Sequence, residues 1–315
     1  MASDLNRGGM PQLADLPRPV KTYHAETYDR ISPSKTSFEA KDKSVFITGG
    51  ATGIGFSIAQ SFAEAGVAKI VIVSRSPVPQ AEAKKQLEAD FPNVEVVLFQ
   101  ASMTDYARMD EIMDSVGTVG EFDVFWMRSE ADISEDVLVL CAAVSHKFVP
   151  AVDFPSSEVH DTIVTNVNAH YHILRHYLTQ PAPVSGSKTV INVSSLSAVM
   201  TIPFQTGYGP SKGALTQMVQ HLSYQHSPTK DGVRMFSYHP GAFLTTAAAK
   251  AGLTEDMMKF EDIRLPGHFA VWLASPESDF LHGRFVWAHW DVDELLELKG
   301  RAEKNPLFLT IGLLQ

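Results

Sequence analysis

The chain is poor in cysteine: Cys141 is the only one among 315 residues, so no internal disulfide can form. Basic residues are fewer than acidic ones, 26 Lys and Arg against 36 Asp and Glu, which disfavours nucleic acid as the main partner. No apolar run approaches the roughly 18 residues of a membrane span, and the first twenty residues lack the apolar core of a secretory signal. We therefore expect a cytoplasmic protein without membrane partners.

What the chain does contain is enough apolar sequence, 44%, for one large domain. From Ser44 onward, β-branched runs alternate with helical segments, which is typical of a parallel sheet covered by helices on both faces. The predicted strands are residues 44–48, 69–73, 94–99, 137–143, 189–195 and 233–240. The predicted helices are residues 56–65, 81–89, a segment through Met113, 159–177 and 212–225. We predict a single α/β domain over residues 41–315, including a C-terminal tail, with a Rossmann-like, doubly wound parallel sheet.

Two regions do not follow this alternation. Residues 1–40 carry four prolines among polar residues and predict an N-terminal extension whose role the sequence does not indicate. The start of the fourth strand is ambiguous, because Asp123-Val124 and Asp136-Val137 both fit it. The segment between them, FWMRSEADISED, could be a surface hairpin, a dimer contact or a feature particular to this chain.

A glycine-rich turn directly follows the first predicted strand. Thr48-Gly49-Gly50-Ala51-Thr52-Gly53-Ile54-Gly55 lies between that strand and a predicted helix. Glycines let the backbone approach a pyrophosphate, and the helix N-terminus favours the anion. An isolated glycine triplet is about as often an ordinary turn, but the strand-turn-helix context favours dinucleotide binding. The predicted contacts are Gly49, Thr52, Gly53, Ile54 and Gly55.

The end of the second strand indicates which dinucleotide is bound. About twenty residues past the glycines, an acidic residue that binds the ribose would mark NAD. Ser74-Arg75-Ser76 stands there instead, and a serine hydroxyl with a planar guanidinium suits the 2′-phosphate that only NADP carries. A solvent-facing arginine is the alternative. We predict NADP as the cofactor, with contacts from these three residues.

A third feature concerns catalysis. Tyr208 and Lys212 are one helical turn apart and can face the same ligand, although such a pair often arises by chance. Ser195 lies thirteen residues upstream, at the end of a predicted strand. Hydride transfer to a carbonyl carbon leaves negative charge on oxygen and requires a proton donor. Tyr208 is the predicted acid, and Lys212 with an oxidised nicotinamide would lower its pKa from about 10.

With these features, residues 41–290 resemble a classical short-chain dehydrogenase/reductase. The resemblance rests on TGxxxGxG from Thr48 to Gly55, on Ser195, and on YxxxK at Tyr208 and Lys212. The segment KTYHAETY and the ending GRFVWAHWDVDEL are similar to a fungal-type branch often found in secondary metabolism. The resemblance implies an oxidoreductase and a homodimer or homotetramer formed through the helices that carry Asn166 and Tyr208.

The resemblance also implies roles for single residues. Ser195 would hydrogen-bond the substrate oxygen, Lys212 would also hold the nicotinamide ribose, and Asn166 would hold a water in a proton relay. Pro240, Gly241 and Thr245 would hold the nicotinamide carboxamide. Besides the glycine-rich turn and residues 74–76, the expected cofactor contacts are Ser102, Met103, Ala142, Ala143, Asn166, Tyr208, Lys212, Pro240, Gly241, Phe243 and Thr245.

The chain departs from the family in one strand. The Asn-Asn-Ala-Gly that follows the family's fourth strand is Leu140-Cys141-Ala142-Ala143 here, which puts local stability in doubt. Cys141 itself is expected to be a small buried side chain, because free cysteine is usually buried and inert.

Several histidines need an interpretation. His172 and His176 have the spacing of a metal pair, and His170 lies on the same predicted helix, but no glutamate follows His172 and no third ligand is suggested. We therefore predict a polar or subunit-contact face and no metal. His239 is left unassigned.

The substrate is expected to be an apolar small molecule. Its walls should come from residues 198–204, from Phe243, and from residues 246–266 as a lid, although simple packing explains these apolar side chains equally well. The predicted substrate contacts are Ser195, Ile202, Phe204, Tyr208 and Phe243.

Three functions compete on this fold. The first is NADP(H)-dependent interconversion of a ketone and a secondary alcohol, for example on a natural-product intermediate. The alternative is a redox-neutral isomerase, dehydratase or cyclase. A cofactor-sensing regulator ranks last, because it would be expected to lack Ser195 or Tyr208.

Overall fold

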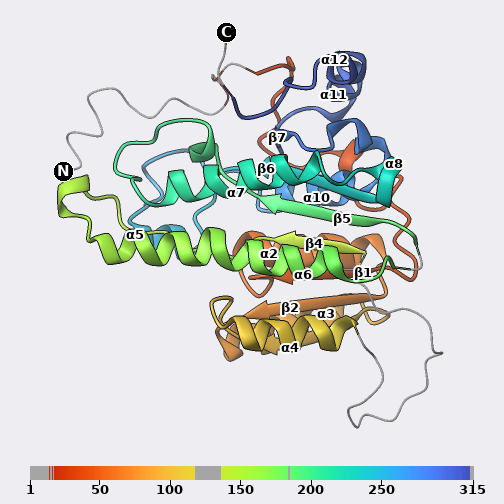
Figure 1. Cartoon of the computed structure of the whole chain (residues 1–315), viewed down its shortest axis with the longest axis horizontal. Helices are drawn as coiled ribbons and strands as arrows, with labels where there is room; N and C mark the ends of the chain where they lie inside the picture. Colours follow the sequence, from red (N-terminus) through yellow and green to blue (C-terminus); the bar gives the residue numbers. More distant parts are fainter. Residues whose placement is uncertain (1–13, 15, 17, 118–135, 184, 313–315) are drawn as a thin grey trace.

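The structure is a computed structural model that describes residues 14, 16, 18–117, 136–183 and 185–312. These residues form one parallel sheet of seven strands in the order β3-β2-β1-β4-β5-β6-β7 (Figure 1). The strands are β1 Ser44–Thr48, β2 Lys69–Ser74, β3 Glu95–Gln100, β4 Val137–Leu140, β5 Lys188–Val193, β6 Val233–His239 and β7 Phe285–Trp287. From β1 to β3 the chain adds strands toward one edge of the sheet, and from β4 it adds them on the other side of β1. The switch point thus lies between β1 and β4, and the predicted doubly wound, Rossmann-like architecture is confirmed.

Helices cover both faces of the sheet. Helices α2, α3 and α10 pack on one face, and α4, α6 and α7 on the other (Figure 1). The main helices are α2 Gly53–Ala65, α3 Pro77–Asp90, α4 Tyr106–Gly117, α5 Ser156–Ile163, α6 Ala169–Thr179, α7 Tyr208–Ser223 and α10 Leu265–Ala274. The shorter ones are α8 Pro228–Asp231, α9 Thr246–Ala251, α11 Val292–Glu297, α12 Lys299–Lys304 and the 3₁₀ turns Asp29–Ile31, Ala151–Asp153, Leu196–Ala198 and Pro276–Leu281.

The strands have apolar side chains on both faces because both faces are buried. In β1, Val45 and Ile47 belong to the core under α2 and α10, whereas Phe46 belongs to the core under α4 and α6. β2 divides in the same way, with Ile72 in the first core and Val71 in the second. This is the reason why the strands appear in the sequence as continuous β-branched runs.

Some elements differ from the sequence prediction, and one decides between the alternatives that it left open. The helix predicted over 159–177 contains a π-helical turn, Val164–Asn168, between α5 and α6. β4 begins at Val137, whereas Asp123-Val124 and most of the segment after it lie outside the described residues. β7 was not predicted, because three residues are too few to show a periodicity.

The N-terminal segment packs against the C-terminal part of the domain. Tyr23 forms an antiparallel bridge with Trp290, and Arg30 pairs with Glu277 and with Asp293. Residues 18–40 are called the arm below. Within the described residues, no helix has the length and apolar character needed to cross a bilayer.

Candidate active site

The glycine-rich turn joins β1 to α2 at the carboxyl edge of the sheet. Gly49 and Gly53 have φ angles of 72° and 54°, in the left-handed region that favours glycine. A Cβ on Gly55 would lie 2.2 Å from the carbonyl oxygen of Gly49. The first N–H groups of α2 have no partner within the helix and favour an anion there. The turn therefore has the backbone shape that a pyrophosphate requires.

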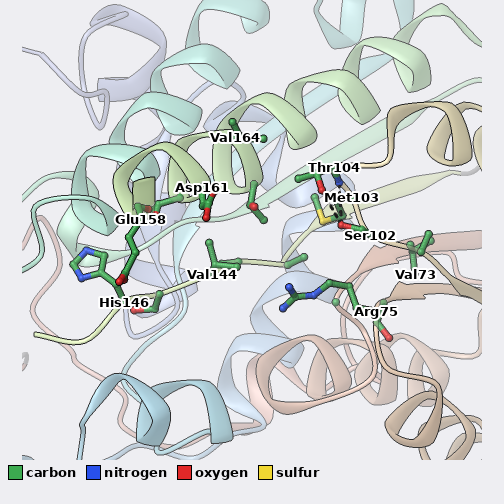
Figure 2. A pocket seen from close by; sticks show the side chains of 18 residues that line it. Val73, Arg75, Ser102, Met103, Thr104, Val144, His146, Glu158, Asp161 and Val164 are labelled. Atoms are coloured by element: carbon green, nitrogen blue, oxygen red, sulfur yellow. Dashed lines mark hydrogen bonds between the residues drawn. The ribbon is translucent and has the colours of Figure 1, made fainter. Parts of the chain in front are cut away.

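A first cavity of about 500 Å³ opens beside this turn, at the ends of β1 to β4 and against α5. Figure 2 shows the guanidinium of Arg75 pointing into it. Among the described residues, no hydrogen bond or ion pair engages that guanidinium, and the buried Ser74 hydroxyl also has no partner there. Predicted cofactor residues that line this cavity are Gly49, Ser74, Arg75, Ser102, Met103, Ala142 and Ala143.

A second cavity of about 360 Å³ adjoins the first, and Gly49, Ala142 and Ala143 line both. It combines residues from the turn, from the end of β5, from α7 and from the loop after β6. The predicted residues that line it are Thr52, Gly53, Ile54, Gly55, Ser195, Ile202, Tyr208, Lys212, Pro240, Gly241, Phe243 and Thr245. The two cavities together form a continuous site for an extended ligand, at the strand ends where such folds bind them.

Three predicted residues do not line either cavity. Ser76 is the exposed residue immediately before α3. Phe204 has a φ angle of 64° in the turn that precedes α7, whereas Ile202, two residues earlier, lines the second cavity. Asn166 is buried inside the π-helical turn. Within the segment 246–266 expected to form a lid, Thr246 and Met258 line the second cavity.

Tyr208 begins α7 and lies in the second cavity with Ser195 and Lys212. Burial raises the pKa of Tyr208 to about 12, and a hydrogen bond with Ser195 offsets only part of this rise. The Nζ atom of Lys212 lies 5.9 Å from the centroid of the Tyr208 ring and donates to the carbonyl oxygen of Val193 over 2.9 Å. Burial also lowers the pKa of Lys212 to about 8. The expected joint effect of Lys212 and an oxidised nicotinamide on the pKa of Tyr208 stays a prediction.

The side chain of Asn166 is fully engaged within the protein. Its Oδ1 accepts from the N–H of Val144 over 2.8 Å, and its Nδ2 donates to the carbonyl oxygen of Val144 over 2.9 Å and to Ser211 Oγ over 3.0 Å. Its own carbonyl oxygen lies 3.1 Å from His170 Nδ1. In this structure Asn166 therefore joins the π-helical turn to the segment after β4.

Thr48 holds the segment after β4, where the family's asparagines are absent. Its hydroxyl accepts from the N–H groups of Cys141 and Ala142, over 2.9 and 3.1 Å, and donates to the carbonyl oxygen of Val139. β1 and β4 are thus joined at the point where the family pattern is lost. Cys141 is only partly exposed and lines the second cavity, and burial raises its thiol pKa to about 11.

Two histidines support the catalytic segments, and sequence reasoning did not assign them. His146 Nε2 accepts from the N–H groups of Gly207 and Tyr208, over 3.2 Å each. His239 Nδ1 accepts from the N–H of Leu196 over 3.1 Å, next to Ser195. The sequence carried no signal for either role, because each pair is far apart along the chain.

Two histidines of α6 interact with carboxylates. His172 Nε2 lies 2.8 Å from Asp110 Oδ1, and His176 contacts both Asp110 and Asp114. No group of three or more potential ligands with metal-binding geometry occurs among the described residues.

Comparisons with known proteins agree with this geometry. The model of the short chain dehydrogenase family matches residues 43–256. The chain is 50% identical over 299 residues to the short chain dehydrogenase/reductase nsrO of Aspergillus novofumigatus, covering 94% of this chain and 97% of the relative. It is 49% identical over 296 residues to the short chain dehydrogenase/reductase AacuD of Aspergillus aculeatus, covering 94% and 96%.

Solved structures share the fold at lower identity. The L-sorbose reductase of Gluconobacter frateurii, in complex with NADPH and L-sorbose, superposes with a TM-score of 0.68 at 20% identity, covering 80% of this chain and 97% of that one. The RhlG/NADP complex of Pseudomonas aeruginosa gives the same score and identity, covering 80% and 96%. The family match and the fungal relatives together show that this chain belongs to the short chain dehydrogenase family.

Proposed function

We propose that this protein is an NADP(H)-dependent oxidoreductase that interconverts a ketone and a secondary alcohol on an apolar small molecule. The observation that carries the proposal is the presence of Ser195, Tyr208 and Lys212 in a cavity continuous with the glycine-rich turn. A dinucleotide at the turn and a carbonyl beside Tyr208 would then lie in adjoining spaces.

The residues at the end of β2 support NADP over NAD. An acidic residue there would repel a 2′-phosphate, whereas Arg75 offers a guanidinium that no described residue engages. The buried Ser74 hydroxyl, without a partner among the described residues, offers a second donor. NADP(H) also occurs in two solved structures that share this fold.

When bound, the nicotinamide would supply or accept the hydride. The chain's own contribution is proton transfer at the substrate oxygen. Because burial raises the pKa of Tyr208 to about 12, the phenol keeps its proton at neutral pH and can donate it to an oxygen that gains negative charge. Ser195, which hydrogen-bonds Tyr208, would orient the same oxygen.

Lys212 would act in two ways: its positive charge lies beside Tyr208, and its ammonium group would hold the nicotinamide ribose. It is only 2% exposed, and its Nζ atom has protons beyond the one donated to Val193. A buried ammonium beside the phenol stabilises the phenolate that remains after proton donation. The lowered pKa of about 8 places Lys212 close to the pH at which it can replace that proton.

The walls of the second cavity support an apolar substrate. Ile202, Phe243, Leu253 and Met258 line it beside the polar groups of Ser195 and Tyr208. A mostly apolar pocket with a few convergent polar groups is typical of small-molecule sites. The proposed substrate class includes natural-product intermediates, and two relatives at about 50% identity are fungal short chain dehydrogenase/reductases.

We also propose a homodimer or homotetramer formed through α6 and α7. Tyr171 on α6 and Met218 on α7 are exposed apolar side chains, 42% and 37% accessible. Light scattering of the purified protein would measure the assembly.

The proposed function is tested by following NADPH absorbance with a panel of hydrophobic ketones and aldehydes. Wild-type protein should consume NADPH, and Tyr208→Phe should lower the rate about 10²- to 10⁴-fold, the usual contribution of general acid catalysis, while binding NADPH normally. Tyr224→Phe is the matched control, because Tyr224 follows the end of α7, is 67% exposed and lines neither cavity. Unchanged turnover in Tyr208→Phe would remove the tyrosine from the mechanism.

A further inference from the structure

The chain makes an excursion between β6 and α10 that forms much of the second cavity. It leaves the sheet through Pro240 and Gly241, continues through α9, and returns at Glu261. Phe243, Thr246 and Met258 of this excursion line the cavity. The position of the excursion therefore decides the shape of the site.

Ala242 and Glu261 join the two ends of the excursion twice. The N–H of Glu261 donates to the carbonyl oxygen of Ala242 over 3.2 Å, and the N–H of Ala242 donates to Glu261 Oε2 over 2.6 Å. The loop from 243 to 260 is thus closed at its base by one residue pair. The backbone bond needs no particular side chain, but the second bond needs the carboxylate.

The carboxylate of Glu261 is buried, with only 5% of its side chain exposed. Burial by itself favours the neutral acid, yet His289, Tyr23 and the N–H of Ala242 together hold the pKa of Glu261 below its usual range. Tyr23 donates its hydroxyl to Glu261 Oε1, and His289 Nε2 lies 3.0 Å from the same oxygen. A buried carboxylate needs such partners, because a buried charge that loses a donor is costly.

Tyr23 comes from the arm, 238 residues away from Glu261. The arm is held in place at this point, since the N–H of His24 donates to the carbonyl oxygen of His289 over 2.8 Å. The Tyr23 ring stacks on the ring of His289, with centroids 4.7 Å apart. The hydroxyl of Tyr23 is therefore presented to Glu261 by an ordered segment.

Glu261 also packs directly against the turn after β6. Gly241 has a φ angle of 121°, and a Cβ on it would lie 2.6 Å from Glu261 Oε2 and 3.0 Å from His289 Nε2. No other residue fits between the carboxylate and this turn. A shift of Glu261 would consequently change the position of Gly241 and Ala242, which line the second cavity.

We propose that Tyr23 and Glu261 form a latch that positions residues 240–245 and closes the base of the 243–260 excursion. Through this latch, the arm helps to determine the shape of the cofactor and substrate site. Both are positioning residues, because each acts through Ala242 and the turn. The consequence for nicotinamide binding rests on the proposed function, whereas the latch itself does not.

The arm offers a matched pair of variants. Tyr23→Phe removes the hydroxyl that reaches Glu261. Tyr28→Phe removes a hydroxyl from the same arm, but that hydroxyl accepts from the N–H of Val292 at the start of α11. If the arm only stabilises the fold, both variants should lower the melting temperature and behave alike at the site.

The first measurement is amide hydrogen exchange of the full-length protein without cofactor. Tyr23→Phe should accelerate exchange in peptides that cover residues 240–262, and Tyr28→Phe should not. Glu261→Gln should give the same pattern, and the double variant Tyr23→Phe/Glu261→Gln should add little, because both changes act through one carboxylate. Equal exchange in the two tyrosine variants would overturn the latch.

The second measurement is the affinity for NADPH and the split between KM and kcat. Tyr23→Phe should weaken NADPH by about fivefold or more, the lower end of typical coupling between sites, with a smaller change in kcat. Faster exchange with unchanged NADPH affinity and KM would overturn the link between latch and site. If wild-type protein bound neither NADPH nor NADH, the proposed function would fall, and the exchange comparison would still decide the latch.

Discussion

The two ends of the site are built by different physical means. At the glycine-rich turn, residues 48–55 are contiguous, and the shape follows from positive φ angles and from close backbone contacts that exclude a Cβ. At the Tyr208 end, segments from five parts of the chain meet, and side chains such as His146, Glu261 and Tyr23 hold them together. The first end depends on missing side chains, whereas the second depends on hydrogen-bonded ones.

This difference predicts distinct effects of substitution. At the glycine-rich turn, adding a single methyl group should cause a large loss of stability and of cofactor binding. At the Tyr208 end, removing a single polar atom from a supporting side chain such as His146 or Tyr23 should have a smaller effect, since each segment has several partners.

The largest effect is expected for Gly55→Ala. The new Cβ would lie 2.2 Å from a backbone oxygen that cannot move independently of the turn. We expect a loss of about 3 kcal/mol or more, the upper range for overpacking, with cofactor binding lost. Gly300→Ala is the control, because α12 leaves space for a Cβ there. For both variants, calorimetry measures the NADPH affinity and thermal unfolding measures the stability. Normal NADPH binding by Gly55→Ala would contradict the steric explanation.

Arg75→Ala should have the next largest effect, and it should be confined to NADPH. Loss of a charge-assisted hydrogen bond to a phosphate weakens binding by about 1.5 to 3 kcal/mol. NADH lacks the 2′-phosphate and should bind as before, and Arg75→Lys should lie between wild type and Arg75→Ala because it keeps the charge. Titration with both nucleotides measures this, and equal losses for both would refute the role of Arg75.

The pH dependence tests the catalytic end. Because burial lowers the pKa of Lys212 to about 8, its charge is present below that pH and is lost above it. We expect the rate of carbonyl reduction to be level near pH 7 and to fall by up to about tenfold per pH unit above 8. Tyr208, with a pKa of about 12, should add no inflection in that range. A rate that stays constant to pH 10 would show that the charge on Lys212 is not required.

The same shift predicts a change in stability with pH. The unfolded chain binds the Lys212 proton up to a pKa of about 10.4, whereas the folded chain releases it near 8. The contribution of Lys212 to the free energy of unfolding should therefore rise from pH 8 to about pH 10. Lys212→Met should remove this rise, which denaturant unfolding at several pH values would measure.

The smallest effect is expected for His146→Phe. The ring contact with Phe154, at 3.9 Å between centroids, can be kept, but the N–H groups of Gly207 and Tyr208 lose their acceptor. We expect a loss of stability of about 1 kcal/mol, as for a helix cap, and a several-fold lower kcat. Because His146 also lines the first cavity, the NADPH affinity should fall too, but by less than kcat. A change in NADPH affinity equal to the change in kcat would contradict a role mainly at Tyr208.

Much of the site was predictable because its motifs are local. The turn at 49–55 and the pair Tyr208 and Lys212 each lie within one strand-turn-helix or one helical turn, where spacing along the chain determines spacing in space. The doubly wound sheet followed from six apolar runs whose two faces are both buried. Phe204 lines neither cavity, and the positive φ of its turn before α7 was not visible in residue spacing.

Other features depended on contacts between distant segments. The π-helical turn around Asn166 keeps the helical pattern of the sequence almost unchanged, so no periodicity marks it. Thr48 of β1 binds the N–H groups that follow β4, and Tyr23 reaches Glu261 across 238 residues. Residue pairs of this kind have no fixed separation along the chain, so residue spacing does not predict them.

The sequence by itself determined the fold class, the glycine-rich turn and the pairing of Tyr208 with Lys212, because backbone sterics and helical periodicity act over a few residues. Only the tertiary structure decided three things: the partners of Asn166, the histidines that hold the segments of Tyr208 and Ser195, and the packing of the arm against Glu261. The physical reason is that a buried polar group must find a partner wherever the folded chain provides one, and that requirement is satisfied in space and not along the sequence.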